Sequence, residues 1–199
     1  MEKKKEKSVK TANTMSCPVG FIKHKDSCYH IIGSSGVTWP IANTYCQLHG
    51  SKLVEIETES EQEFIEDMIK AAKDGRAYWI GATNRLGKGK WKWESSLQSL
   101  SPFNMWHTNW KNWAEEIESP SCALIDTYDS NQWMFWPCDM NFYMTGKNHD
   151  TKTGIGFLCE KNLPQQAKKD KGGKYKKQRK QRRKGKRNWQ RKLQKKKIK

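Results

Sequence analysis

Six cysteines are the residues of this sequence whose chemistry is easiest to define. They are Cys17, Cys28, Cys46, Cys122, Cys138 and Cys159. An even number of cysteines confined to one part of a chain favours three disulfides and an oxidising compartment, although six cysteines allow fifteen pairings. Zinc is the alternative, but the sequence contains no Cys-x-x-Cys spacing and no paired Cys/His cluster. We therefore expect disulfides rather than a metal centre.

No group of residues in the sequence is arranged as catalysis requires. There is no spacing that places a nucleophile beside a base, no pair of catalytic carboxylates and no phosphate-binding loop. His149 has no visible partner for metal binding or acid–base work, and we interpret it as a surface histidine. The sequence therefore predicts a protein that is not an enzyme.

Charge divides the chain into three parts. The formal net charge of the 199 residues is +17, but residues 162–199 hold 19 Lys and Arg against the single acid Asp170. Residues 1–16 carry a net charge of +3, which leaves −4 for residues 17–161. We predict a basic disordered leader (1–16), a globular domain (17–161) and a basic, low-complexity, disordered tail (162–199).

The tail predicts a polyanionic partner. A dense run of cations that cannot bury apolar surface stays extended, and it attracts acidic matrix protein, sulfated polysaccharide, anionic lipid or a mineral face. The densest run contains Lys176, Lys177, Arg179, Lys180, Arg182, Arg183 and Lys184. Such a run also fits a nuclear signal or nucleic-acid binding, but the cysteines of the domain favour the outside of the cell.

The amino terminus bears on where the protein is found. The first seven residues are mostly charged, no apolar run of signal-peptide length follows them, and no stretch is long and apolar enough for a transmembrane helix. From the cysteines we nevertheless expect a secreted protein. The chain would then be a mature or incomplete one, or be exported by another route.

A hairpin is expected at the centre of the core, between residues 78–82 and 90–94. Aromatic and charged residues alternate in 90–94, as in a strand with one buried face, and Gly87-Lys88-Gly89 supplies the turn. Gly81 would let a neighbouring backbone approach closely. Three large side chains of this hairpin need burial: Trp79, Trp91 and Trp93.

Two helices are expected before the hairpin. The first is capped by Thr38, has Pro40 in its first turn and ends at Gly50. The second begins at the capping box 58–61 and ends at Gly75. Its residues divide into an apolar stripe, Phe64, Ile65, Met68, Ile69 and Ala72, and a water-facing set, Gln62, Glu63, Glu66 and Lys70. Short strands are expected at 27–32, 52–56 and 156–161, and the segments 122–126 and 132–138 precede the last of them.

Residues 95–121 form a long stretch without regular pattern, rich in Trp, Asn and Ser. Long loops of this kind in compact domains are usually functional. We expect Trp106 and Trp110 to pin the loop to the core, and Trp113 to lie at the surface.

These motifs, taken in order, resemble the long form of the C-type lectin-like domain. The residues that carry the resemblance are Cys17-Pro18-x-Gly20-Phe21, Cys28-Tyr29, Trp39 through Cys46, Leu53-Val54-x-Ile56, Glu61-x-x-Phe64-Ile65, Trp79-Ile80-Gly81, Trp91-x-Trp93, Cys122, Trp133, Cys138 and Phe157-x-Cys159-Glu160. The Lys-rich appendage makes the chain similar to the molluscan perlucin-type lectins of shell matrices.

The resemblance implies a fold and a disulfide pattern. The fold is α+β, with two helices, two small antiparallel sheets and long loops that bind ligands. The implied disulfides are Cys17–Cys28, Cys46–Cys159 and Cys122–Cys138. Twenty residues separate Cys138 from Cys159, more than is usual in the family, and we expect the surplus at 145–150 to be an exposed loop insertion.

The resemblance also points to a damaged calcium site. Sugar-binding members hold calcium with a proline-containing motif, an acid before the next cysteine and a Trp-Asn-Asp motif. Here Trp133-Met134-Phe135 replaces Trp-Asn-Asp, and Ala114-Glu115-Glu116 replaces the proline-containing motif. Calcium needs several oxygen ligands, so we expect no high-affinity site. Weak calcium binding at Glu115 and Glu116, helped by Asp126 or Asp129, is the alternative to a solvated acidic loop.

Our functional hypothesis is a secreted, non-enzymatic lectin-like protein that binds glycans, with no cofactor unless the weak calcium site exists. The candidate ligand-binding residues are Asn109, Asn112, Trp113, Glu115, Glu116 and Glu118. A second hypothesis keeps the fold and proposes calcium-independent protein binding through an exposed apolar patch of Met134, Phe135 and Trp136. An intracellular nucleic-acid-binding protein is the third.

Overall fold

The computed structural model describes residues 16–87, 90–100, 102–109, 120–128, 131–145 and 151–164. Within these residues the chain forms two helices and ten strands. The helices are α1 (Trp39–Leu48) and α2 (Glu59–Ala72). The strands are β1 (Ile22–His24), β2 (Ser27–Ile32), β3 (Lys52–Leu53), β4 (Tyr78–Thr83), β5 (Lys92–Trp93), β6 (Ser121–Asp126), β7 (Gln132–Pro137), β8 (Phe142–Thr145), β9 (Thr151–Gly154) and β10 (Gly156–Asn162).

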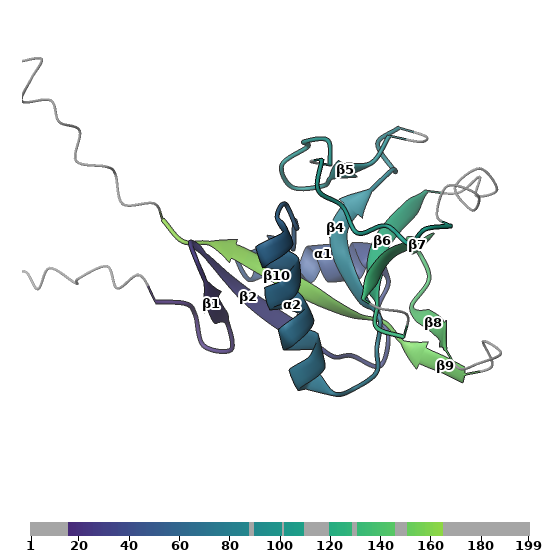
Figure 1. The fold of residues 1–199 in the computed structure, drawn as a ribbon, viewed down its shortest axis with the longest axis horizontal. Coiled ribbons are helices and arrows are strands. Elements are labelled where there is room, and N and C mark those ends of the chain that lie inside the picture. Colours follow the sequence, from purple (N-terminus) through teal and green to yellow (C-terminus); the bar gives the residue numbers. More distant parts are fainter. Residues whose placement is uncertain are drawn as a thin grey trace, which may run out of the picture. The chain divides into compact units, whose positions relative to one another are not determined.

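The strands form two sheets. The larger sheet has the order β1-β2-β10-β4-β6-β7, with β3 paired to β10 and β5 paired to β4 (Figure 1). Its strands pair in antiparallel fashion except β4 and β10, which run parallel. The smaller sheet is the β8–β9 hairpin, which flanks part of the predicted insertion; residues 146–150 lie outside the described residues. The α+β fold with two sheets and two helices is therefore confirmed.

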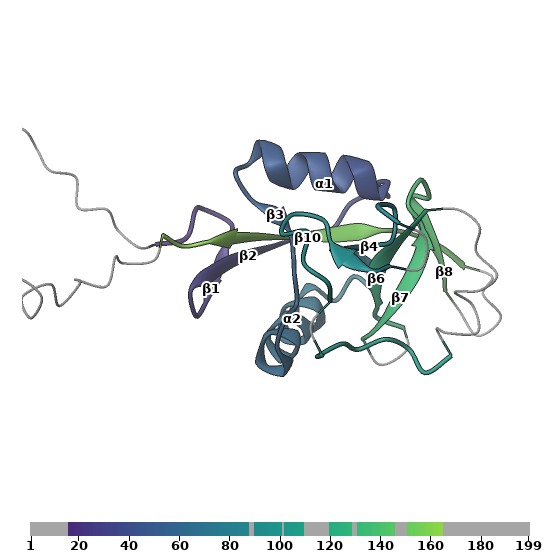
Figure 2. The ribbon, with the colours of Figure 1, turned by 90° about the horizontal axis from the view of Figure 1, so that it is seen from above.

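The larger sheet separates two hydrophobic cores, one beneath each helix (Figure 2). Alternate residues of β4 enter opposite cores: Ile80 lies with the side chains of α2, whereas Trp79 lies with those of α1. Every residue of β4 and β6 is buried as a result. Successive side chains of a strand point to opposite faces, so a central strand covered on both faces has no exposed residue.

The predicted central hairpin is present as the pair β4–β5. Ala82 lies opposite Trp93, and both Trp79 and Trp93 are completely buried. A Cβ atom added to Gly81 would lie 3.0 Å from two backbone oxygens, those of Leu53 and Val54. The glycine is therefore needed because the chain at 53–54 crosses directly over it.

The helix ends differ in detail from the sequence expectations. Thr38 makes no side-chain capping bond. Thr58 does cap α2, accepting from the backbone N–H of Glu61, but the carboxylate of Glu61 accepts from the N–H of Glu57 rather than from that of Thr58. Helix α2 ends at Ala72 with Lys73 in the left-handed conformation, so Gly75 is not its cap.

Three disulfides are present, with the pairing that the resemblance implies. Cys46–Cys159 joins α1 to β10 across a sequence separation of 113 residues. Closing a loop of this length stabilises a fold by about 4–5 kcal/mol in the chain-entropy model. Cys17–Cys28 fastens the first described residues to β2, and Cys122–Cys138 joins β6 to the end of β7.

Candidate functional site

Residues 102–109, which we call the docked segment, lie against strand β7. The backbone N–H of Trp133 donates to the carbonyl of Met105 at 2.7 Å, and that of His107 donates to the carbonyl of Trp133 at 2.9 Å. Trp106 and Trp133 thus form a parallel bridge. Two backbone hydrogen bonds therefore fix the part of the long loop that precedes the predicted ligand residues.

Four aromatic side chains, Trp91, Trp106, Trp133 and Phe135, form what we call the aromatic cluster. The ring of Trp106 lies 4.7 Å from that of Trp91, 5.7 Å from that of Trp133 and 6.4 Å from that of Phe135, centroid to centroid. Most of these rings are tilted or edge-on, the arrangements in which aromatic pairs attract beyond simple burial. Trp106 therefore pins the loop to the core, as expected, while Trp110 lies outside the described residues.

Helix α2 supports this arrangement through a buried polar residue. Gln62 is 2% exposed, and its Oε1 accepts from Trp133 Nε1 at 2.9 Å. Its Nε2 donates to Glu66 Oε1 at 2.8 Å and to the carbonyl of Asn131 at 3.2 Å. The expectation that Gln62 faces water is wrong, because the indole of Trp133 reaches the helix at that position.

A second buried polar group anchors the beginning of the long loop. Glu55 is 3% exposed; its Oε1 accepts from the N–H of Ser96 at 2.9 Å, and its Oε2 pairs with Lys52 Nζ at 2.7 Å. Lys52 also lies 3.3 Å from Glu160 Oε2. Burial by itself would lower the pKa of Lys52, but Glu160 and Glu55 raise it above its usual value. The lysine thus stays charged and holds both carboxylates in place.

A neighbouring buried pair, Tyr29 and Glu61, ties β2 to the start of α2. The Tyr29 hydroxyl donates to Glu61 Oε1 at 2.7 Å. Burial raises the pKa of both groups. This pair is a structural contact between the amino-terminal hairpin and α2.

Two positions that the resemblance assigns to calcium, Met134 and Phe135, do not fit the ion, while Glu115 and Glu116 lie outside the described residues. Phe135 is 5% exposed and packs against Trp91 and Trp106, and Met134 is half-buried against the opposite core. Neither side chain supplies an oxygen atom, and calcium binds through oxygen. Within the described residues, no three His, Cys, Asp or Glu side chains are grouped so that they could hold a metal ion.

The same burial corrects the proposed apolar patch of Met134, Phe135 and Trp136. Met134 and Trp136 are half-buried on the α1 side, while Phe135 is buried on the α2 side. These residues alternate across a strand and cannot share one exposed face. The observation on which the protein-binding hypothesis rested is therefore absent.

Most of the predicted ligand residues lie beyond the part of the chain that the structure describes. Asn109 is exposed at the end of the docked segment, and its N–H donates to His107 Nδ1 at 3.2 Å. Asp126 is 6% exposed and accepts from the N–H of Tyr128, which shapes the turn after β6. Outside the described residues lie Asn112, Trp113, Glu115, Glu116, Glu118, Asp129, His149 and the tail cations from Lys176 to Lys184.

The sequence reasoning missed a group of cations on the β4–β5 hairpin. Arg85 and Lys90 are exposed and Lys92 is half-buried. Their signal was visible in the sequence, because no Asp or Glu occurs between Asp74 and Glu94. We had interpreted this stretch only as a strand and a turn.

Comparison with known proteins agrees with this geometry. The family model for the Lectin C-type domain matches residues 35–145. The chain is 32% identical over 106 residues to a perlucin-like protein of Mytilus galloprovincialis, covering 53% of this chain and 67% of that one. It is 36% identical over 91 residues to human C-type lectin domain family 10 member A, covering 45% of this chain and 26% of that one.

The fold also matches a solved structure. Human lithostathine superposes with a TM-score of 0.59 at 24% identity, covering 79% of this chain and 99% of that one. Of the two curated relatives, the chain spans about a quarter of the human lectin and about two thirds of the perlucin-like protein. Among the described residues, neither helix is long and apolar enough to cross a membrane.

Proposed function

Because the chain belongs to the Lectin C-type domain family, we propose that it is a secreted, non-enzymatic protein that recognises glycans of an extracellular matrix without a high-affinity calcium ion. The family match covers the docked segment and the strands beneath it. The further proposals are the matrix setting, suggested by the likeness to a perlucin-like protein, and a mineral or anionic partner for the tail.

One observation carries this proposal: the docked segment is held by the aromatic cluster and by the backbone of Trp133. The residues where a calcium lectin would place oxygen ligands instead supply packing, with Phe135 under Trp106. A segment fixed in this way is ordered before any ligand arrives, which lowers the entropic cost of binding. Preorganisation of the docked segment by packing, without an ion, therefore supports calcium-independent recognition.

The ligand contacts in this proposal come from the end of the docked segment and the residues after it. Asn109, Asn112, Glu115, Glu116 and Glu118 offer hydrogen-bond acceptors and donors for sugar hydroxyls, and Trp113 offers a face for a sugar ring. The tail supplies electrostatic attachment to a polyanionic matrix. Because domain and tail belong to one chain, binding by one raises the effective concentration of the other.

A neutral-glycan array probed with the full chain tests the proposal. Neutral glycans carry no charge for the tail to bind, so retention reports on the domain. We expect retention of at least one neutral glycan, unchanged between buffers containing calcium and EDTA. Loss of retention in EDTA would contradict calcium independence, and no retention in either buffer would contradict glycan recognition and return attention to protein ligands. A separate comparison of nucleic acid with sulfated polysaccharide tests the tail. Stronger retention of the chain on nucleic acid would favour the nucleic-acid alternative for the tail.

A further inference from the structure

In the part of the chain that the structure describes, the β4–β5 hairpin carries cations with no acidic partner. From residue 75 to residue 93 the chain contains Arg76, Arg85, Lys88, Lys90 and Lys92 but no Asp or Glu. Arg76 is paired with Asp74 at 3.2 Å, and Lys88 lies outside the described residues. Among the described residues, no carboxylate lies within 4.0 Å of the charged groups of Arg85, Lys90 or Lys92. We call these three residues the hairpin cations.

The sheet register places part of this group on a defined face. Lys92 lies opposite Thr83, Thr83 lies opposite Cys122, and Cys122 lies opposite Trp136. Residues directly opposite each other on neighbouring strands point to the same face of a sheet. Lys92 and the half-buried Trp136 therefore lie on the same face of the sheet as α1, with the buried Thr83 and Cys122 between them.

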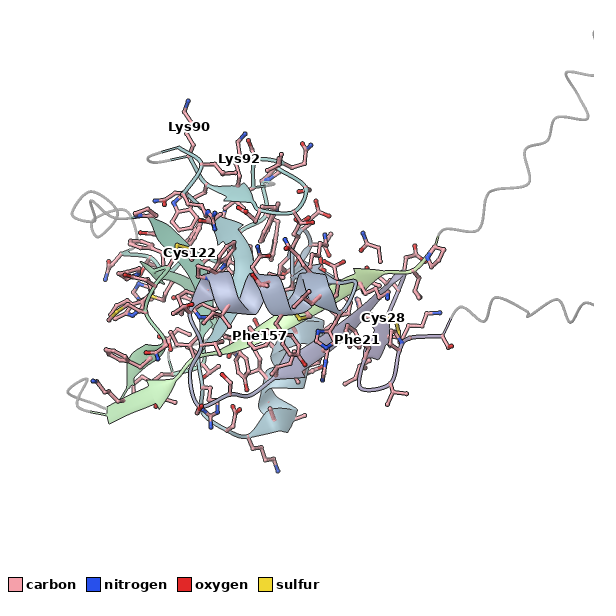
Figure 3. All side chains as sticks on the ribbon, turned by 180° about the vertical axis from the view of Figure 1, so that it is seen from behind. Phe21, Cys28, Lys90, Lys92, Cys122 and Phe157 are labelled. Carbon is pink, nitrogen blue, oxygen red and sulfur yellow. A yellow bond between two sulfur atoms is a disulfide. The ribbon has the colours of Figure 1, made fainter. Side chains whose placement is uncertain are left out.

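Arg85 lies at the edge of the same face. Its guanidinium carbon is 5.5 Å from the ring centroid of Trp39, the first residue of α1. Figure 3 shows this side of the molecule, with Lys90 and Lys92 projecting from the end of the hairpin, away from Phe157 beneath α1. The hairpin cations thus surround the end of β4 on the α1 side.

The opposite side of the hairpin contacts the docked segment. Trp91, between Lys90 and Lys92, packs its ring 4.7 Å from Trp106 of the docked segment. Since alternate residues of a strand point to opposite faces, the hairpin has an aromatic side toward the ligand loop and a cationic side toward solvent.

We propose that the hairpin cations bind the sulfate or carboxylate groups of an acidic glycan. Like charges repel one another unless an anion is present. The chain supplies no acid from residue 75 to residue 93, although Glu94 directly follows β5 and residues 17–161 carry a net charge of −4. An acidic saccharide supplies such anions, and the ring of Trp136 offers an apolar surface nearby. This inference rests on the proposed glycan-binding role and defines the chemical class of the ligand.

A nucleic acid fits this face less well. Proteins that bind single strands present exposed aromatic platforms on which bases stack. On the hairpin, Trp93 is completely buried and Trp91 is half-buried in the aromatic cluster. Trp136, on the face of Lys92, is half-buried as well, so none of these rings is an exposed stacking platform. The charges therefore favour an anionic ligand, and the lack of an exposed platform among these residues favours a saccharide over bases.

The test compares two double variants of the full chain, so that the tail is the same in both. Lys90→Gln/Lys92→Gln removes two hairpin cations. Lys23→Gln/Lys70→Gln removes two exposed lysines from β1 and α2, with the same loss of charge. The probes are a sulfated chondroitin hexasaccharide, its desulfated and carboxyl-reduced counterpart, and a single-stranded DNA hexamer. Affinity is measured at 50 and 200 mM salt, with amide chemical shifts recorded on the wild-type chain.

We expect the hairpin variant to bind the sulfated hexasaccharide about 5- to 20-fold more weakly at 50 mM salt and to lose about one unit of salt slope, because charge-assisted contacts and counterion release are removed. The control variant should stay within about twofold. Shifts on adding the sugar should include the backbone amides of Arg85 and Lys92 and the indole N–H of Trp136. Unfolding curves of both variants should match the wild type, since the replaced side chains are at the surface.

Three outcomes would overturn the inference. Equal weakening in both variants would mean that only net charge matters, and absence of shifts at the hairpin would place the sugar elsewhere. Equal affinity of the wild type for the sulfated hexasaccharide and its neutral counterpart would show that the anionic groups do not contribute to binding. That result would leave the proposed glycan role intact. DNA binding with the same dependence on Lys90 and Lys92 would assign the face to nucleic acid. If no neutral glycan is retained on the array, the proposed function is contradicted, whereas the measured effect of the hairpin variant on sulfated-sugar binding stands.

Discussion

Replacing Gln62 with alanine should loosen the docked segment from a distance, because Gln62 holds the indole of Trp133. Trp133 is completely buried, and its Nε1–H donates to Gln62 Oε1 at 2.9 Å. A buried donor that loses its partner costs about 1–3 kcal/mol, and the lost bond to the carbonyl of Asn131 adds about 1 kcal/mol. We expect Gln62→Ala to lower the free energy of unfolding by about 2–4 kcal/mol.

The effect should reach the site through the backbone of Trp133. The amides of Trp133 and His107 make the two hydrogen bonds that hold the docked segment. If the indole shifts, both amides should exchange faster with solvent than in the wild type. The assays are urea unfolding for the stability and hydrogen exchange followed by NMR for the two amides.

Two further variants separate the hydrogen bond from other causes. Glu63→Ala replaces the neighbouring exposed residue on the same helix and should change the stability by less than about 0.5 kcal/mol. Gln62→Met keeps the volume but supplies no acceptor, so it should be nearly as unstable as Gln62→Ala. If Gln62→Met is as stable as the wild type, the loss in the alanine variant comes from a cavity, and the reasoning from the hydrogen bond is wrong.

Three other predictions use different parts of the fold. Phe135→Asp puts a carboxylate where calcium lectins have one, yet the variant should bind no calcium in calorimetry. It should lower the free energy of unfolding by about 3–5 kcal/mol, since it leaves a charge in the aromatic cluster. Calcium binding with the stability of the wild type would contradict this prediction. Gly81→Ala should lower the free energy of unfolding by about 1–3 kcal/mol, because the new Cβ would press on two backbone oxygens. At Gly75 a new Cβ would have no atom within 4 Å, so Gly75→Ala should cost only the strain of the positive φ. Urea unfolding curves of the two variants would show the difference. Burial lowers the pKa of His24 and of His30 below the ordinary 6.5, so the unfolded chain binds protons at a higher pH than the folded chain does. The free energy of unfolding should therefore fall as the pH drops from 7.5 through 6.5 to 5.5. Replacing both histidines by Gln should flatten this dependence, and an unchanged slope would show that these histidines are not its cause.

The centre of the fold could be predicted from the sequence because several local signals agree there. The alternation of Trp91 and Trp93 with lysines fixes the face of the hairpin, and Gly81 marks the close crossing of another segment. Local pattern and tertiary packing point the same way at these positions. Such agreement is expected in a minimally frustrated sequence.

The pairing of the cysteines could not be obtained from spacing alone. Cys46 and Cys159 are neighbours only because β10, at the end of the domain, returns to the middle of the sheet beside β4. Nothing local to either cysteine encodes that return. The resemblance to a known domain supplied it.

The environments of Gln62 and Phe135 could not be predicted for the same reason. Gln62 lies on the polar side of the helical pattern, and only the reach of the Trp133 indole makes that side interior. Phe135 is apolar, but which face of β7 is covered depends on the docked segment, whose path has no periodic signal. Both residues are decided by contacts between segments far apart in the sequence.

An aromatic contact holds the docked segment to β7 in the described part of the chain. An ion bound by oxygen atoms from two segments ties those segments together. Here Phe135 meets Trp106 instead, and the backbone bonds of Trp133 fix the register between the two segments. A packed aromatic contact does not depend on ion concentration, so the docked segment stays in place where calcium is scarce. Our proposals therefore place the search for the ligand at residues 75–93, which contain no acid and which contact the docked segment through Trp91.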